Sequence, residues 1–234
     1  MKPTMKSRIK LVILLGDGMA DHPIDALDGK TPLEAAETPN MDRIARAGRG
    51  GLATTVPAGM PPGSDVANLA VMGYDPERYY SGRAPLEAAA MGVALGPDDV
   101  AFRCNLVNVD LEKGIMVDYS AGHISSEEGH ELITSLSKAQ SDARLYPGVS
   151  YRNLLVQEKN DGLAADCTPP HDITGQPIAG HLPKGEGSET LRELMASSVP
   201  ILASHPVNLR RAAQGKRPAN MIWLWGQGKA PSMP

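Results

Sequence analysis

The chain has 234 residues, enough for one large domain or two small ones, and its 41% hydrophobic and 21% charged residues exclude disordered, collagen-like and coiled-coil proteins. The 23 basic and 27 acidic residues give a net charge of −4 without the basic stripe that binds a phosphate backbone, so we expect no nucleic-acid partner. Apolar runs are too short for a membrane span and none resembles a signal peptide, which predicts a cytoplasmic protein with no membrane partner.

The first predicted elements belong to a parallel sheet. Residues 9–15 form a continuous β-prone run that stops at the Gly-Asp-Gly triplet of residues 16–18, as a strand buried on both faces does. Such a strand delivers Asp17 to the carboxyl end of the sheet, where open α/β sheets bind their ligands. A helix over residues 38–47 and a second short strand over residues 51–56 follow.

A proline-rich loop precedes the next predicted helix. Residues 57–63 contain three prolines and two glycines, which favour an irregular loop. The helix that follows begins at Ser64 or Asp65 and runs to residue 72, so Ser64 lies at a helix N-terminus. A further helix is predicted over residues 85–91.

From residue 100 the pattern changes and a second unit begins. Residues 100–109 and 115–117 predict a hairpin. The remaining predicted elements are a helix over 126–136, strands over 154–157 and 164–168, a helix over 189–203 and a strand over 220–225. Cys104 and Cys167 lie far apart without a CxxC partner, so we expect buried thiols and neither a disulfide framework nor a thiolate zinc site.

Two nucleotide-binding motifs can be excluded. The glycines that follow residue 15 fail the dinucleotide pattern G-x-G-x-x-G, because its third glycine is Asp21. The Gly-Lys-Thr of residues 29–31 lacks the upstream glycine of a P-loop, a position held by Ile24.

Asp17 and Ser64 are the candidates for chemistry that remain. A serine hydroxyl is a poor nucleophile at neutral pH, but a bound divalent cation and a helix N-terminus both stabilise its alkoxide. A strand-end aspartate is a suitable hard ligand for such a cation. On residue type alone, an N-cap role for Ser64 and a turn role for Asp17 are the commoner alternatives.

Longer stretches of sequence carry a resemblance. The chain strongly resembles the archaeal-type 2,3-bisphosphoglycerate-independent phosphoglycerate mutases of the alkaline phosphatase superfamily, over essentially its whole length. The matching segments are GDGMAD (16–21), GKTPLEAAETPNMDRIA (29–45), PPGSDVANLAVMGYDP (61–76), YYSGRAPLEAA (79–89), DDVAFRCNLV (98–107), SAGHIS (120–125), TPPHDITG (168–175) and PANMIWLWGQG (218–228).

The resemblance implies an α/β fold in which a partial alkaline-phosphatase-like parallel sheet domain carries an inserted α+β domain. By this reading, residues 1–97 form the N-terminal part of the metalloenzyme domain. Residues 98–228 form the inserted, substrate-holding domain, and residues 229–234 connect to a C-terminal half that lies outside this sequence.

The resemblance also implies a reaction and its residues. Family members interconvert 3-phosphoglycerate and 2-phosphoglycerate, a step of glycolysis and gluconeogenesis, through a phosphoserine. By analogy Ser64 is the nucleophile, and Asp17 and Ser64 are ligands of two divalent ions, manganese, magnesium or zinc. The expected phosphoglycerate contacts are His123 and Arg152, with His171, Asp172, Arg83 and Lys184 as further candidates.

Departures from the family pattern leave alternatives open. Family members continue past residue 234 and carry the other metal ligands there, so we expect this chain alone to be inactive, to expose apolar surface and to self-associate. Trp225 stands where archaeal members carry an arginine. A homoserine kinase-like phosphotransferase and an inactive binding fragment are the alternative functions.

His130, His181 and His205 are expected at the surface. The basic cluster of residues 210–217 either attracts phosphorylated substrates or is a solvated face.

Overall fold

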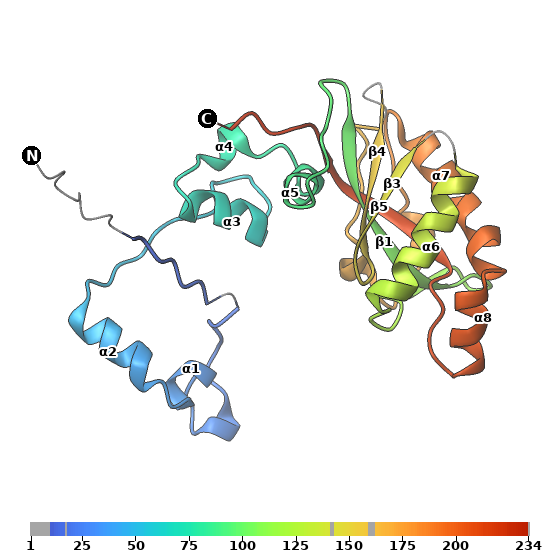
Figure 1. Ribbon diagram of the computed structural model, residues 1–234. Coiled ribbons are helices and arrows are strands. Elements are labelled where there is room, and N and C mark those ends of the chain that lie inside the picture. The colour runs from blue at the N-terminus through green and yellow to red at the C-terminus, as the bar shows by residue number, and fades with distance from the viewer. Residues whose placement is uncertain (1–9, 17, 141–142, 159–161, 234) are drawn as a thin grey trace, which may run out of the picture. The chain divides into compact units, whose positions relative to one another are not determined.

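The computed structural model describes residues 10–16, 18–140, 143–158 and 162–233 (Figure 1). The chain divides into two compact units, Met1–Asn68 and Leu69–Pro234, called unit 1 and unit 2 below. Within the described residues, no helix combines the length and the apolar character needed to cross a bilayer.

Unit 1 contains short helices joined by extended chain. The prediction of a helix over 38–47 is confirmed by α2, and the predicted helix start at Ser64 is confirmed by α3, whose last residues belong to unit 2. In α1 the Thr31 side chain accepts a hydrogen bond from the backbone N–H of Glu34, which caps the helix. The elements are η1 (Asp25–Leu27), α1 (Pro32–Ala35), α2 (Pro39–Ala47) and α3 (Ser64–Val71).

The two strands predicted in the first hundred residues are not observed. Residues 10–15 and 51–56 belong to no strand, and residue 9 lies outside the described residues. The large apolar side chains of Leu11–Leu15 are 46–86% exposed. A β-prone run becomes a strand only when a neighbour accepts its backbone hydrogen bonds, and no described segment pairs with either run. The predicted parallel sheet is thus absent from the described residues, where every strand pair is antiparallel.

Unit 2 is a mixed α/β unit built on a five-stranded antiparallel sheet. The long first strand β1 lies between β4 and β5, while β3 pairs with the outer side of β4 and β2 pairs with the last residues of β1. The predicted hairpin over 100–117 is confirmed. The strands are β1 (Val100–Asp110), β2 (Ile115–Asp118), β3 (Arg144–Val149), β4 (Arg152–Gln157) and β5 (Met221–Gly228).

Helices cover the sheet unequally. The longer helices lie on one face, and α5 lies against the other (Figure 1). Side chains alternate between the faces along β1, so Phe102, Cys104 and Leu106 join the large core beneath the longer helices. The helices are α4 (Pro76–Tyr79), α5 (Arg83–Ala90), α6 (Ser126–Ala139), α7 (Ser188–Ala203) and α8 (Pro206–Ala213), with short turns η2 (Pro170–Ile173) and η3 (Ile178–Gly180).

A smaller apolar cluster holds α5 against the second face. Ala84 and Ala88 of α5 pack on Ala101 of β1, together with Leu154 and Val156 of β4. The chain before α5 also crosses the end of β5 closely, because a side chain added at Gly82 or Gly228 would collide with the backbone of the other segment. The close approach places the start of α5, with Arg83, beside β5.

Sequence patterns predicted this unit incompletely. The helices predicted over 126–136 and 189–203 are confirmed as α6 and α7, and the strand over 220–225 is confirmed as β5. The prediction of a strand over 164–168 is wrong, since only an isolated bridge between Asp166 and Lys184 occurs there. Strand β3 and helix α8 were not predicted.

Candidate functional site

The face of the sheet that carries α5 also carries polar side chains. Arg103 and Asn105 alternate with the buried apolar residues of β1 and therefore point to this face. The register places Arg152 of β4 opposite Asn105, and Trp225 of β5 opposite Arg103. Directly opposed residues share a face, so a basic and aromatic patch forms across three strands.

Arg103 lies at the centre of this patch. The residue is only 4% exposed, its Nε atom lies 3.0 Å from Oε2 of Glu87, and its guanidinium lies 4.5 Å from the centroid of the Trp225 ring. Burial lowers the pKa of Arg103; the charge of Glu87 opposes this effect, and the neighbouring Arg83 and Arg152 add to it.

Arg83 shares the carboxylate of Glu87 with Arg103. Arg83 reaches the same Glu87 at 3.7 Å and lies 5.7 Å from the Trp225 ring. The positive charge of Arg83, Arg103 and Arg152 exceeds the negative charge of Glu87, and guanidinium groups bind phosphate and carboxylate through paired hydrogen bonds. We call Arg83, Arg103, Arg152 and Trp225 the arginine face.

A row of edge-to-face rings extends from the arginine face. The His171 ring lies 5.3 Å from the Trp225 ring and 6.1 Å from the Tyr119 ring. The Tyr119 ring lies 5.7 Å from the Tyr151 ring, which in turn lies 6.1 Å from the His123 ring. This row connects the two histidines through aromatic contacts. Such contacts restrict the orientations of the rings.

The structure places most of the predicted substrate contacts on this row or at its ends. Arg83 lies over Trp225, which His171 also contacts, whereas Arg152 lies 5.4 Å from the Tyr151 ring that His123 contacts. These four residues come from α5, β4, η2 and the turn before α6. Only the folded chain brings them near one another.

The two other residues predicted to contact the substrate, Asp172 and Lys184, make fewer contacts with the row of rings. Asp172 is exposed, and its Oδ1 lies 3.4 Å from Nε2 of His171. Lys184 belongs to another loop, where its backbone pairs with Asp166, and its side chain makes none of the ring or ion-pair contacts above. Contact of Asp172 and Lys184 with phosphoglycerate stays a prediction.

Ser64 is the first residue of α3 and is partly buried. The loop before it is held by a 2.7 Å hydrogen bond from the Gly63 N–H to the Pro61 carbonyl, and the Gly63 carbonyl accepts the first helical hydrogen bond from Ala67. This geometry confirms the predicted helix start and leaves the chemical role of Ser64 as a prediction. Asp17 lies outside the described residues.

The described residues contain no group of three or more His, Cys, Asp and Glu side chains that could hold a metal ion. The predicted two-ion site therefore stays a prediction that depends on Asp17 and Ser64.

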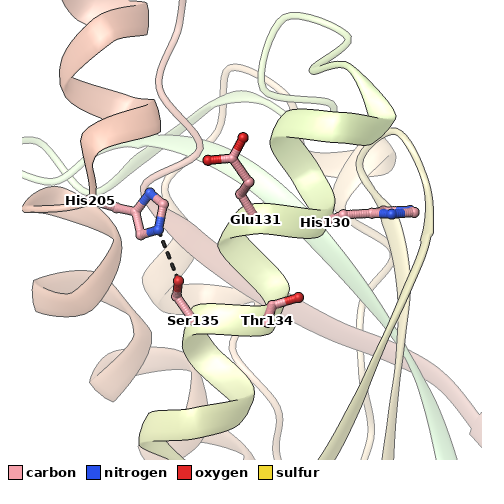
Figure 2. Close-up of a pocket in the computed structure, with 5 residues that line it drawn as sticks. All are labelled: His130, Glu131, Thr134, Ser135 and His205. Atoms are coloured by element: carbon pink, nitrogen blue, oxygen red, sulfur yellow. Dashed lines mark hydrogen bonds between the residues drawn. The ribbon is translucent and has the colours of Figure 1, made fainter.

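A pocket of about 360 Å³ lies between α6 and the start of α8 (Figure 2). In it Nε2 of His205 lies 2.9 Å from Oγ of Ser135, the arrangement of a serine nucleophile and its base. However, Nδ1 of His205 accepts a hydrogen bond from the backbone N–H of Val207 at 3.2 Å. In a neutral imidazole the proton is then on Nε2, which donates a hydrogen bond to the Ser135 hydroxyl oxygen. His130 points away from His205 in Figure 2 and contacts the Gly148 carbonyl at 2.7 Å. His205 thus caps α8, and the pair is not an activated serine.

Comparison with known proteins identifies the family. Residues 45–208 match the model of the 2,3-bisphosphoglycerate-independent phosphoglycerate mutase family. The chain belongs to this family. A mutase of that name from Methanothrix thermoacetophila is 62% identical over 97% of the chain and 57% of its own length, and one from Methanosarcina mazei is 58% identical over 95% and 56%.

Two solved structures are also similar to the chain. A cofactor-independent phosphoglycerate mutase from Thermoplasma acidophilum matches with a TM-score of 0.57 and 28% identity, over 93% of this chain and 58% of that chain. A protein from Pyrococcus horikoshii matches with a TM-score of 0.65 and 30% identity, over 93% and 51% of the two chains. The chain spans about half the length of the curated mutases it matches.

Sequence reasoning about this mutase-family chain overlooked Arg103, Asn105 and Glu87. A signal was available, because Arg103 and Asn105 stand two residues apart within an otherwise apolar strand. Two polar residues at that spacing point to one face and need partners there. The role of Glu87 as the shared carboxylate depends on how α5 packs on the sheet, which no local pattern indicates.

Proposed function

We propose that the protein containing this chain interconverts 3-phosphoglycerate and 2-phosphoglycerate in the cytoplasm. The membership of the mutase family and the names of its relatives support the proposal. The structural observation that supports this function in the chain itself is the arginine face together with the adjoining His123 and His171. Phosphoglycerate has a phosphate and a carboxylate, and the excess of positive charge there suits a ligand with both.

The proposed reaction uses two displacements at phosphorus. The Ser64 hydroxyl oxygen attacks the phosphoryl group, the bond from phosphorus to O3 of glycerate breaks, and O3 takes the proton that Ser64 gives up. The glycerate then presents O2, which attacks the phosphoserine and returns its proton to Ser64. Arg83, Arg103, Arg152, His123 and His171 would bind an anionic group of phosphoglycerate.

Two divalent cations belong to the proposal as the family's cofactor, with Asp17 and Ser64 as the ligands that this chain supplies. The described residues do not gather a set of carboxylates and imidazoles that fits two ions. We therefore assign no step of the reaction to a metal.

The direct test removes the nucleophile from the full-length protein. Ser64→Ala should lower 3-phosphoglycerate turnover, measured by coupling to enolase, more than about a thousandfold, because only the attacking oxygen is lost. Ser204→Ala removes a serine at the C-terminal end of α7 and should leave turnover unchanged. Turnover by Ser64→Ala within a few fold of the parent would exclude the phosphoserine. Activity with homoserine and ATP, without mutase activity, would instead favour the kinase.

A further inference from the structure

Backbone strain concentrates beside His123 and Arg152. Among the described residues other than glycine, four have positive φ, and three of them are Ala121 (49°), His123 (48°) and Ser150 (58°). Gly122, between the first two, has φ of 68°. Three consecutive left-handed residues are unusual, and such backbone persists only where its surroundings hold it.

Asp118, the last residue of β2, stabilises this left-handed turn through several hydrogen bonds. Its carboxylate accepts hydrogen bonds from the Ser120 N–H at 2.8 Å, the Ser120 hydroxyl at 2.6 Å and the Gly122 N–H at 3.0 Å. Arg217 adds an ion pair at 2.6 Å. The Ser120 hydroxyl oxygen in turn accepts the His123 N–H at 3.1 Å, so Asp118 fixes His123 through one intermediate residue.

A second arginine holds the same turn from α8. Arg211 is buried, donates to the Ala121 carbonyl at 2.6 Å and pairs with Glu128 of α6 at 2.5 Å. Its Nε also donates to the Arg217 carbonyl at 2.9 Å. The left-handed turn is thereby tied to two helices and to the chain that precedes β5.

The other strained position, Ser150, lies in the turn between β3 and β4, two residues before Arg152. Its hydroxyl donates to the Ile124 carbonyl at 2.5 Å, and its N–H donates to the Ser126 hydroxyl oxygen at 3.0 Å. Its carbonyl packs so closely on α6 that a side chain at Gly129 would collide with it. The turn that carries Arg152 is therefore tied to the segment that directly follows His123.

We infer that Asp118 and Ser150 are positioning residues that hold His123 and Arg152 against the Tyr151 ring, preformed for one anionic group of phosphoglycerate. The inference rests on the proposed function. Strain at the two turns lowers the stability of the fold, and prior ordering of the two side chains lowers the entropy lost when the ligand binds. His123 and Arg152 would make the contact, while Asp118 and Ser150 act through them.

The experiment compares variants of the full-length protein by calorimetric titration with 3-phosphoglycerate, alongside thermal unfolding and amide hydrogen exchange. Asp118→Ala should weaken binding about tenfold or more, because a misplaced contact residue loses most of its effect. Gly122 and His123 should lose amide protection while the strands keep theirs. Asp118→Asn, which keeps an acceptor oxygen, should restore part of the affinity.

Asp110 provides a matched control. Its carboxylate accepts backbone N–H groups at 3.2 and 3.1 Å and pairs with Lys113 at 3.2 Å. Asp110 adjoins the turn between β1 and β2, whereas Asp118 is at the far end of β2. Asp110→Ala should bind 3-phosphoglycerate like the parent.

Ser150→Ala tests the second turn and should weaken binding in the same direction. Parental affinity in both Asp118→Ala and Ser150→Ala, or equal weakening by Asp118→Ala and Asp110→Ala, would overturn the inference. Retained protection of Gly122 and His123 in Asp118→Ala would also overturn it. Absence of 3-phosphoglycerate binding by the parent would contradict the proposed function itself.

Discussion

At the scale of single residues, burial decides the chemistry of both thiols. Cys104 is buried in the core of unit 2, which confirms the small apolar role expected for it, and Cys167 is partly buried. Burial raises the pKa of Cys104 far above its usual range. Burial, with the charge of Asp166, raises the pKa of Cys167 to about 12 against a hydrogen bond with Gln227. Thiolates are thus scarce at both positions near neutral pH.

Alkylation measures this directly. With iodoacetamide at pH 8, Cys104 should stay unmodified in the folded protein, and Cys167 should react slowly, as mass spectrometry of digested samples would show. Both should react fully in concentrated urea, which serves as the positive control. Modification of Cys104 at the same rate with and without urea would contradict the buried position.

The ion pair of Asp99 and Arg144 links stability to pH. Burial raises the pKa of Asp99, but the Gly96 N–H at 2.9 Å and the Arg144 guanidinium at 2.6 Å outweigh it, so the pKa lies below its usual value. A carboxyl whose pKa is lowered on folding stabilises the fold above its unfolded pKa of about 4. That contribution disappears as the pH falls through the folded pKa.

Asp99→Asn should therefore reduce the free energy of unfolding by about 1–2 kcal/mol at pH 7. The difference from the parent should shrink below about pH 4, where the parent carboxyl becomes protonated. Urea unfolding at a series of pH values measures both effects, with the exposed Glu112→Gln as the control. A difference that stays constant from pH 7 down to the lowest pH would rule out the ion pair as its source.

At the scale of elements, hydrogen bonds from side chains place structure that local patterns do not predict. Helix α8 begins at a His205 cap and Pro206, and Asn208 secures it: its amide donates to the Leu202 and Ala219 carbonyls at 2.8 Å each and accepts the Ala219 N–H at 2.9 Å. Strand β3 contains Pro147 and Gly148, which weaken strand character, and it survives as the outer strand beside β4.

Asn208→Ala should lower the free energy of unfolding by about 2–3 kcal/mol, because three buried backbone groups lose their partners. Chemical denaturation followed by tryptophan fluorescence suits the measurement, since Trp223 and Trp225 lie in β5. Asn40→Ala on the exposed surface of α2 is the matched control and should have little effect. A loss below about 0.5 kcal/mol for Asn208→Ala would show that water replaces the missing bonds.

At the scale of the whole molecule, the apolar core belongs to unit 2. Both buried clusters lie between residues 84 and 225, whereas Val66 is the one buried residue in the described part of unit 1. Regions with few buried contacts open at low free-energy cost. The two units should thus differ in local stability.

Limited proteolysis should show this difference. Brief digestion of the 234-residue chain with a protease of broad specificity should cut first between residues 10 and 60 and leave unit 2 intact, as mass spectrometry of the fragments would show. Hydrogen exchange should rank the units in the same order. First cuts within β1 or α7 would contradict the assignment of the core to unit 2.

The sequence by itself determined the elements whose patterns are local and the family that the motifs indicate. The alternating segment of β1, the periodic helices α6 and α7 and the helix start at Ser64 carry their signals in neighbouring residues, and the family follows from long matched segments. The tertiary structure alone decided what depends on distant partners. The run Leu11–Leu15 has no paired neighbour among the described residues and forms no strand, although its residues favour one. The antiparallel register brings Arg103, Arg152 and Trp225 to one face of the sheet. Asp118 and Arg211 hold the left-handed turn before His123. In both places hydrogen bonds and charges from other elements outweigh the local preference of the sequence.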